Sequence, residues 1–137
     1  MIELLRTLSQ ALCEAHVTAA NIAERIGRAQ PRTGSLAPLL VEPKDSSITQ
    51  AEIVGDSDSA PPSYIRLTLT ASALTLDAMR AAFGEGSSVP RSRPGQGARW
   101  LFHVRPQGRR YECALIVETT AAGSDVQTVT LRRDQKV

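Results

Sequence analysis

His103 and Glu112 are the one titratable pair that the sequence places in a position to do acid–base chemistry. They belong to two segments, RWLFHVR and RRYECALIVET, whose apolar and β-branched residues predict a β-hairpin. A short turn centred on Gln107 and Gly108 would place His103 opposite Glu112. A neighbouring carboxylate favours the charged imidazole and can orient it as a base. The alternative is an ordinary cross-strand ion pair.

Cys13, His16 and Cys113 are the other side chains that could act as metal ligands or nucleophiles. Cys13 and His16 stand three residues apart and would share one helix face, but zinc needs four ligands, or three and a water. Cys113 falls on the apolar side of the predicted hairpin, where a thiol stays neutral and inert. We therefore expect no metal site and no cofactor. Two cysteines do not make a disulfide framework, so in a cytoplasmic protein we expect both to be reduced.

Six arginines and no acidic residue lie between Gly86 and Tyr111, in a chain whose net charge is +2. Arginine pairs well with carboxylates, so this stretch is either a solvated loop or a binding element for a protein partner with an acidic surface. We expect residues 86–99 to be mobile until a partner binds. The candidate binding set combines His103 and Glu112 with these arginines: Arg91, Arg93, Arg99, Arg105, Arg109 and Arg110.

The hairpin is expected to bury one face. The turn at Gln107 and Gly108 pairs apolar side chains with each other on that face, as a buried face requires: Val104 with Tyr111, Phe102 with Cys113, and Trp100 with Leu115. Because the aromatic residues are predicted to be buried, they do not form a base-stacking platform, and we do not expect nucleic-acid binding. The residues predicted to point into the core are Trp100, Phe102, Val104, Cys113, Leu115 and Val117.

Residues 2–28 predict one long amphipathic helix. Apolar residues recur at spacings of three and four over three heptads, and Gly27 and Pro31 terminate the pattern. Such a helix would be about 40 Å long, which is more than a small sheet needs. We expect it to cover the sheet, to pair with a second copy of itself, or both. The residues of this seam are Leu5, Leu8, Leu12, Ala15, Ala19, Ile22 and Ile26.

The remaining segments predict an α+β fold in which an antiparallel sheet packs on one long N-terminal helix and one short helix. The expected strands are 48–55, 64–70, the two hairpin segments and 126–132, and the short helix is 74–84, capped by Thr75 and ended by Gly84. The element order is then α-β-β-α-β-β-β. We expect a single domain, residues 1–137, made of a helix (1–30), a linker (31–47) and an α+β body (48–137).

Four segments, LTLDAMRAAFG, RWLF, YECALIVE and VQTVTL, describe a threonine-capped helix that ends at glycine and is followed by aromatic-containing strands. Residues 74–131 in this way resemble the helix–strand–strand–strand module of SmpA/OmlA-type proteins, which is shared with β-lactamase-inhibitor-like folds. The resemblance implies a non-catalytic protein-binding module. Proteins of that type are exported, whereas Glu3 and Arg6 interrupt the N-terminal apolar stretch here in a way that does not fit a signal peptide.

Composition is that of an ordinary globular protein, with 42% hydrophobic and 22% charged residues. No apolar run approaches the ~20 residues that span a bilayer, so we expect a cytoplasmic protein without a membrane span. The leading functional hypothesis is a non-enzymatic protein-interaction module, homodimeric in one version. The alternative is a small-molecule binding protein with an apolar pocket between helix and sheet. An enzyme ranks third, because neither G-x-S-x-G nor H-E-x-x-H occurs in the chain.

Overall fold

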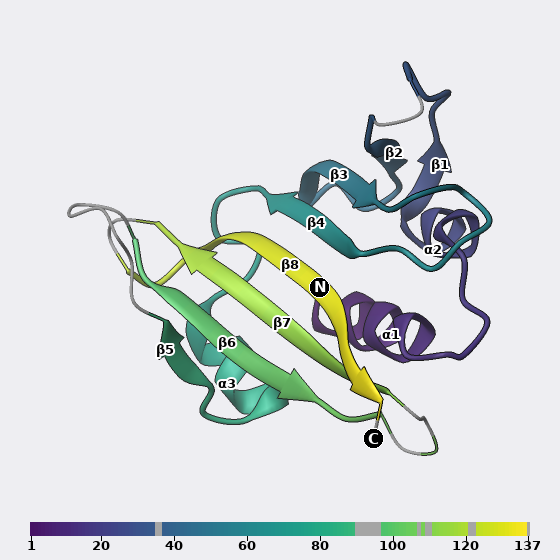
Figure 1. The fold of residues 1–137 in the computed structure, drawn as a ribbon. Coiled ribbons are helices and arrows are strands. Elements are labelled where there is room, and N and C mark those ends of the chain that lie inside the picture. Colours follow the sequence, from purple (N-terminus) through teal and green to yellow (C-terminus); the bar gives the residue numbers. More distant parts are fainter. Residues whose placement is uncertain (35–36, 90–96, 107, 109–110, 121–122, 137) are drawn as a thin grey trace.

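The computed structural model describes residues 1–34, 37–89, 97–106, 108, 111–120 and 123–136. Within them it contains three helices and an eight-stranded antiparallel sheet (Figure 1), so the α+β prediction is confirmed. In chain order the elements are α1 (Ile2–Leu12), α2 (Ala19–Ile26), β1 (Gly27–Ala29), β2 (Leu39–Pro43), β3 (Ile48–Val54), β4 (Tyr64–Leu69), α3 (Leu76–Phe83), β5 (Ser87–Val89), β6 (Arg99–Val104), β7 (Tyr111–Thr119) and β8 (Val126–Lys136).

The strand order across the sheet is β1-β2-β3-β4-β8-β7-β6-β5. The last strand of the chain therefore lies in the middle, where β8 joins the first four strands to the β6–β7 hairpin. The two edge strands, β1 and β5, have only three residues each. Such short edges offer few unpaired backbone groups to another chain.

The single helix predicted over residues 2–28 is wrong, because α1 ends at Leu12 and α2 begins at Ala19. Thr18 has an extended backbone, and its side chain accepts a hydrogen bond from the Asn21 N–H at 3.1 Å, which is N-cap geometry. The apolar repeat survives because both short helices pack against the sheet. Ala15 is exposed, and the other seam residues are at most 2% exposed: Leu5, Leu8, Leu12, Ala19, Ile22 and Ile26.

The predicted linker at 31–47 is also wrong, because it contains β2, which pairs with both β1 and β3. Gly27 permits the tight passage from α2 into β1. A Cβ atom at Gly27 would overlap the carbonyl oxygen of Glu42 on β2. The observed order is therefore α-α-β-β-β-β-α-β-β-β-β rather than the predicted one.

The other predicted elements are present. The alternation in 64–70 forms β4, in which Ile65, Leu67 and Leu69 are buried. Thr75 caps α3 by accepting a hydrogen bond from the Ala78 N–H at 3.2 Å, and the helix ends before Gly84. Period-two alternation and helix caps were thus sufficient to predict these elements.

The β6–β7 hairpin is two residues out of the predicted register. His103 lies opposite Ala114 and not opposite Glu112, so the predicted cross-strand pair is wrong. Pro106 has no N–H with which to extend the ladder, and a slip of two residues leaves every side chain on its predicted face. The buried face is therefore confirmed: Phe102, Cys113, Leu115 and Val117 are at most 1% exposed, and Trp100 and Val104 are half-buried against the core.

The prediction of two reduced cysteines is wrong, because Cys13 and Cys113 form a disulfide. Their Cα atoms are 6.6 Å apart, within the usual range for such a bond. Both residues are buried, at 1% and 0% exposure. Cys13 is the C-cap residue of α1, and its N–H donates to the Ser9 carbonyl oxygen at 3.1 Å, so the last turn of the helix carries it to β7.

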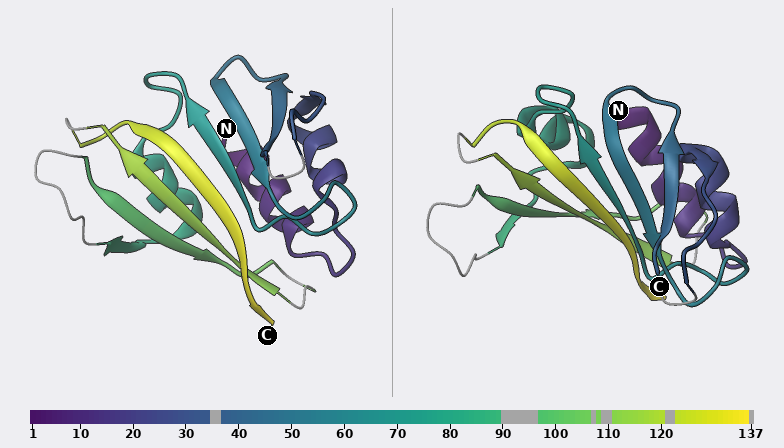
Figure 2. Two further views of the ribbon diagram at one scale, coloured as in Figure 1. Left: turned by 45° about the horizontal axis from the view of Figure 1, so that its top comes forward. Right: turned by 90° about the horizontal axis from the view of Figure 1, so that it is seen from above.

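The three helices pack on one face of the sheet (Figure 2): α2 lies against β1–β3, α1 against β8 and α3 against β6. Strand residues that face the helices, such as Leu67 and Leu131, are fully buried, and neighbours such as Arg66 and Arg132 are exposed. We call the other surface the open face. Its described side chains include Arg28, Leu40, Glu42, Gln50, Glu52, Val54, Tyr64, Arg66, Thr68, Ser87, Val89, Arg99, Leu101, His103, Arg105, Glu112, Ala114, Ile116, Glu118, Thr128, Thr130, Arg132 and Asp134.

Candidate functional site

Charged side chains on the open face form pairs of opposite sign. Among its described residues, each of the five arginines has an acidic neighbour. Two pairs are opposite one another in the strand register, and three are salt bridges with N–O distances of 2.9–3.6 Å. Exposed pairs of this kind contribute little stability, but they leave the face close to neutral. The pairs are Arg28–Glu42, Arg66–Glu52, Arg99–Glu118, Arg105–Glu112 and Arg132–Asp134.

The structure places two of the six predicted arginines. Arg99 begins β6 and contacts Glu118 of β7 at 3.6 Å, and Arg105 follows β6 and contacts Glu112 at 3.5 Å. Both arginines are therefore neutralised by the sheet that carries them. Arg91, Arg93, Arg109 and Arg110 lie outside the described residues, as do residues 90–96 of the loop predicted to be mobile, whereas Ser87–Val89 of that loop form β5.

His103 and Glu112 do share a site, although they are not opposite each other. With Arg132 and Asp134 they line a shallow cavity of about 470 Å³ on the open face. Ala114 lies between His103 and Arg132 in the register, and its short, buried side chain leaves room there. Asp134 was missed because the last strand was expected to end at residue 132, and Arg132 was missed because the sequence did not place β8 beside β7.

Two of the acidic side chains in this cavity are held by neighbouring arginines. Asp134 accepts a hydrogen bond from Nε of Arg132 at 2.9 Å, and Glu112 accepts one from Arg105 at 3.5 Å. His103 is exposed. The arrangement can form ion pairs and hydrogen bonds with a polar partner.

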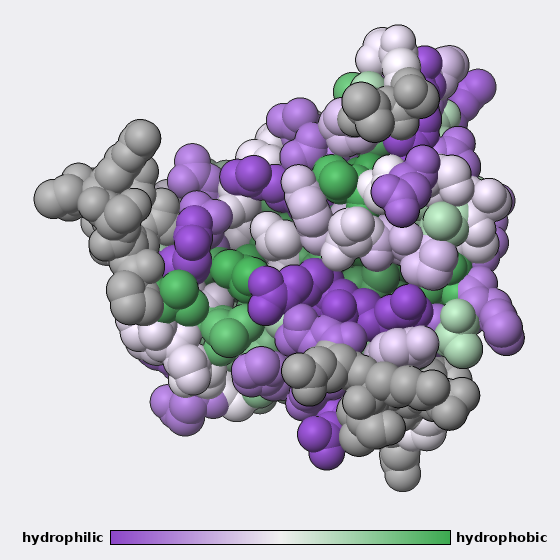
Figure 3. All heavy atoms as spheres, viewed as in Figure 1, coloured by the Kyte–Doolittle hydropathy of each residue, from purple (hydrophilic) through white to green (hydrophobic). Residues whose placement is uncertain are grey.

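An apolar centre lies beside these charges. Leu101 of β6 is opposite Ile116 of β7, which is opposite Thr130 of β8, and all three side chains are half-buried. Figure 3 views the molecule from this side and shows hydrophobic residues next to a band of hydrophilic ones. A half-buried apolar centre surrounded by polar residues is the usual anatomy of a protein-binding surface.

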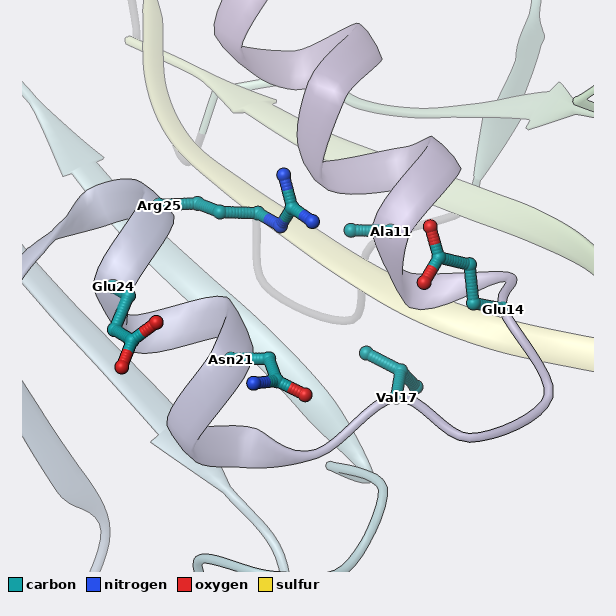
Figure 4. Close-up of a pocket in the computed structure, with 6 residues that line it drawn as sticks. All are labelled: Ala11, Glu14, Val17, Asn21, Glu24 and Arg25. Carbon is teal, nitrogen blue, oxygen red and sulfur yellow. The ribbon is translucent and has the colours of Figure 1, made fainter.

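A second pocket, of about 300 Å³, lies between α1 and α2 and is drawn in Figure 4. Arg25 extends from α2 toward Ala11 of α1, and Glu14 and Val17 come from the segment that connects the helices. Glu14, one of its lining residues, directly follows the disulfide-bonded Cys13 in the chain. Its lining residues are Ala11, Glu14, Val17, Asn21, Glu24 and Arg25.

A third cavity bears on the small-molecule hypothesis. It has a volume of about 320 Å³ and lies between α1, α3 and the end of β6, where Phe83 and Val104 supply apolar surface. Arg6 lies over the Phe83 ring, with its guanidinium carbon 5.8 Å from the ring centroid. This volume is at the lower end of the range for ligand pockets. The small-molecule hypothesis stays a prediction, and this cavity is the place where such a ligand would bind.

Searches for metal sites, membrane helices and related proteins add no further functional site. In the described part of the chain, His, Cys, Asp and Glu side chains form no group of three suited to a metal ion. No helix described here has the length and apolar character to cross a membrane. No protein-family model matches the chain, and neither a curated protein nor a solved structure matches it. The resemblance of residues 74–131 to SmpA/OmlA-type modules therefore stays a hypothesis.

Proposed function

We propose that this protein is a non-enzymatic interaction module that binds a second copy of itself through the open face. The proposal rests on how apolar and charged side chains are arranged on the open face. The helices pack on the opposite side, and the face that they leave uncovered combines an apolar centre at Leu101 and Ile116 with charges that are paired in place. Surfaces of this composition serve protein–protein contacts.

The charge balance of the open face argues against strongly charged partners. A nucleic-acid surface needs arginines that are free to neutralise phosphates, and an acidic protein would need the same. Arg99 and Arg105, the described members of the predicted set, already contact Glu118 and Glu112. A partner that offers both signs of charge fits better.

The positions of these charges favour a second copy as that partner. Arg99 and Arg105 lie at the two ends of β6, and Glu118 and Glu112 lie at the same levels on β7. A two-fold axis parallel to the strands and between β6 and β7 would lay β6 of one copy over β7 of the other. Arg99 would then meet Glu118 of the other copy, and Arg105 would meet Glu112.

The same two-fold axis places the apolar centre of one copy over the apolar centre of the other. Leu101 and Ile116 are register partners, so the axis between their strands places Leu101 of one copy over Ile116 of the other. Self-association through the predicted helical seam would compete with the chain's own core, since Leu5, Leu8 and Leu12 are 0% exposed. The open face requires no such rearrangement.

Sedimentation velocity over a range of concentrations tests the proposal. Wild-type protein should show a concentration-dependent dimer, and Ile116→Asp should weaken association about tenfold or more, because a central apolar contact is replaced by a charge. Thr7→Glu, an exposed position on α1, is the matched control and should associate like wild type. A wild-type chain that is monomeric at every concentration, or equal weakening by both variants, would contradict the proposal.

A further inference from the structure

The end of α1 is attached to the sheet by two adjacent contacts on the covered face. Cys113 of β7 and Arg133 of β8 are register partners, so their side chains project to the same side. Cys113 is bonded to Cys13, and Nη1 of Arg133 donates a hydrogen bond to the carbonyl oxygen of Glu14 at 3.1 Å. Two adjacent residues of the sheet, Cys113 and Arg133, thus hold two consecutive residues of the chain, Cys13 and Glu14.

Arg133 is itself held in place. Its guanidinium carbon lies 4.0 Å from the centroid of the Tyr111 ring, a cation–π contact on the same side of the sheet. The side chain therefore reaches Glu14 from a fixed position. The covalent bond and the hydrogen bond act on the same short segment, residues 13–18, which connects α1 to α2.

That segment depends on such contacts because it contains no regular secondary structure. The start of α2 is secured separately by the loop before β4. The N–H of Ala19 donates to the Ala60 carbonyl at 2.9 Å, and the N–H of Ala20 donates to that of Asp58 at 3.0 Å. The contacts at Cys13 and Glu14 supply the anchor at the opposite end of the connection.

We infer that the Cys13–Cys113 disulfide is a structural cross-link, formed in an oxidising compartment, that locks the α1–α2 connection onto the sheet. It joins residues 100 positions apart, and both cysteines are at most 1% exposed. Attack by an external thiolate requires access to a sulfur atom, so the folded chain protects the bond from reductants. Buried structural disulfides are typical of proteins outside reducing compartments. The prediction of reduced cysteines rested on the expected cytoplasmic location, and the disulfide argues against both.

The Cys13–Cys113 bond can form by thiol–disulfide exchange. One cysteine thiolate attacks a low-molecular-weight disulfide such as oxidised glutathione, forms a mixed disulfide and releases one glutathione thiolate. The second cysteine thiolate attacks the mixed disulfide, forms the Cys13–Cys113 bond and releases the second glutathione. The two cysteines lose two electrons and two protons, which the glutathione disulfide takes up.

Reduction should loosen the connection without unfolding the chain. Sγ of Cys113 lies 3.3 Å from the carbonyl oxygen of Ser9, which can accept a hydrogen bond from a restored thiol. The core around this position is otherwise built from apolar side chains on α1 and the sheet. In the reduced chain, the Cys113 thiol therefore has a hydrogen-bond acceptor within the core.

Counting thiols in wild-type protein tests the inference directly. The chain is refolded in a buffer of reduced and oxidised glutathione, then denatured and treated with a maleimide that adds mass to free thiols. We expect no labelled cysteine. We also expect dithiothreitol to reduce the native protein about tenfold or more slowly than the urea-unfolded protein. Free thiols after refolding, or equal rates of reduction, would overturn the inference.

Amide hydrogen exchange tests whether loss of the disulfide loosens the α1–α2 connection and not the rest of the fold. In the double variant Cys13→Ala/Cys113→Ala, amides of residues 13–20 should exchange about tenfold or more faster than in the oxidised chain, and amides of β4 should be unchanged. Reduced wild-type protein should behave like the variant, which separates loss of the bond from loss of packing. Unchanged exchange at residues 13–20 in both proteins would show that the bond does not lock the connection.

Discussion

Strand β7 carries two contrasting surfaces on one stretch of chain. Residues that face the helices, such as Cys113, Leu115 and Val117, are fully buried, and Cys113 is cross-linked to the end of α1. The alternate residues, such as Glu112, Ile116 and Glu118, are half-buried and lie among paired charges. Side chains on the covered face of β7 therefore stabilise the fold, and in our proposal those on the open face contact a second copy of the protein.

The largest effect should distinguish two adjacent residues of β7. Leu115→Ala removes a fully buried side chain and should lower the free energy of unfolding by about 2–5 kcal/mol. Ile116→Ala, one residue away on the open face, should cost about 1 kcal/mol or less in the monomer. Urea denaturation at low protein concentration measures both. Equal losses would show that the two faces do not differ as described.

A smaller loss is expected where α2 passes into β1. Gly27→Ala introduces a Cβ that overlaps the Glu42 carbonyl, and the backbone must shift at a cost of about 1–3 kcal/mol. Gly34→Ala is the matched control, since no atom lies within 4 Å of the position that its Cβ would occupy and its φ is not positive. Thermal unfolding should separate the two. Similar melting temperatures would argue against the close approach of β1 and β2.

The cap that divides the first two helices should contribute less. Thr18→Ala removes the side-chain acceptor of the Asn21 N–H and should cost about 1 kcal/mol. Thr75→Ala removes the equivalent cap of α3, so the two variants should lose similar stability. A Thr18→Ala variant as stable as wild type, beside a weakened Thr75→Ala variant, would mean that the N-cap does not hold the break between α1 and α2.

The smallest effect on stability is expected on the open face. Arg105→Gln removes an exposed salt bridge to Glu112 and should change the free energy of unfolding by about 0.5 kcal/mol or less. The same change should weaken self-association, because it removes one charge from each copy at the proposed contact. A large loss of stability with unchanged association would reverse the assignment of the two faces.

Local patterns were enough to predict some parts of the fold. Alternation in YIRLTL predicted β4 and its buried residues, and Thr75 with Gly84 predicted the ends of α3. The buried face of the β6–β7 hairpin also followed from alternation, because a slip of two residues preserves it. These features depend on residues close together in the chain.

The features that failed depend on distant partners or on competing local signals. The apolar repeat continued through Thr18, so it concealed the N-cap at which a second helix begins. Nothing near Cys13 indicates that Cys113 lies beside it, since the contact exists only once β7 and α1 are packed. The cavity at His103 likewise needs Arg132 and Asp134, which reach it only because β8 inserts beside β7.

Mixing two charge-reversed variants tests the central claim, self-association through the open face, most directly. Arg99→Glu and Glu118→Arg each place like charges across the proposed two-fold contact, so each variant alone should sediment as a monomer. In an equimolar mixture, the carboxylate at position 99 of one variant faces the guanidinium at position 118 of the other, and a dimer should reappear. A mixture that stays monomeric while wild type dimerises would contradict this arrangement, and a monomeric wild type would contradict self-association itself.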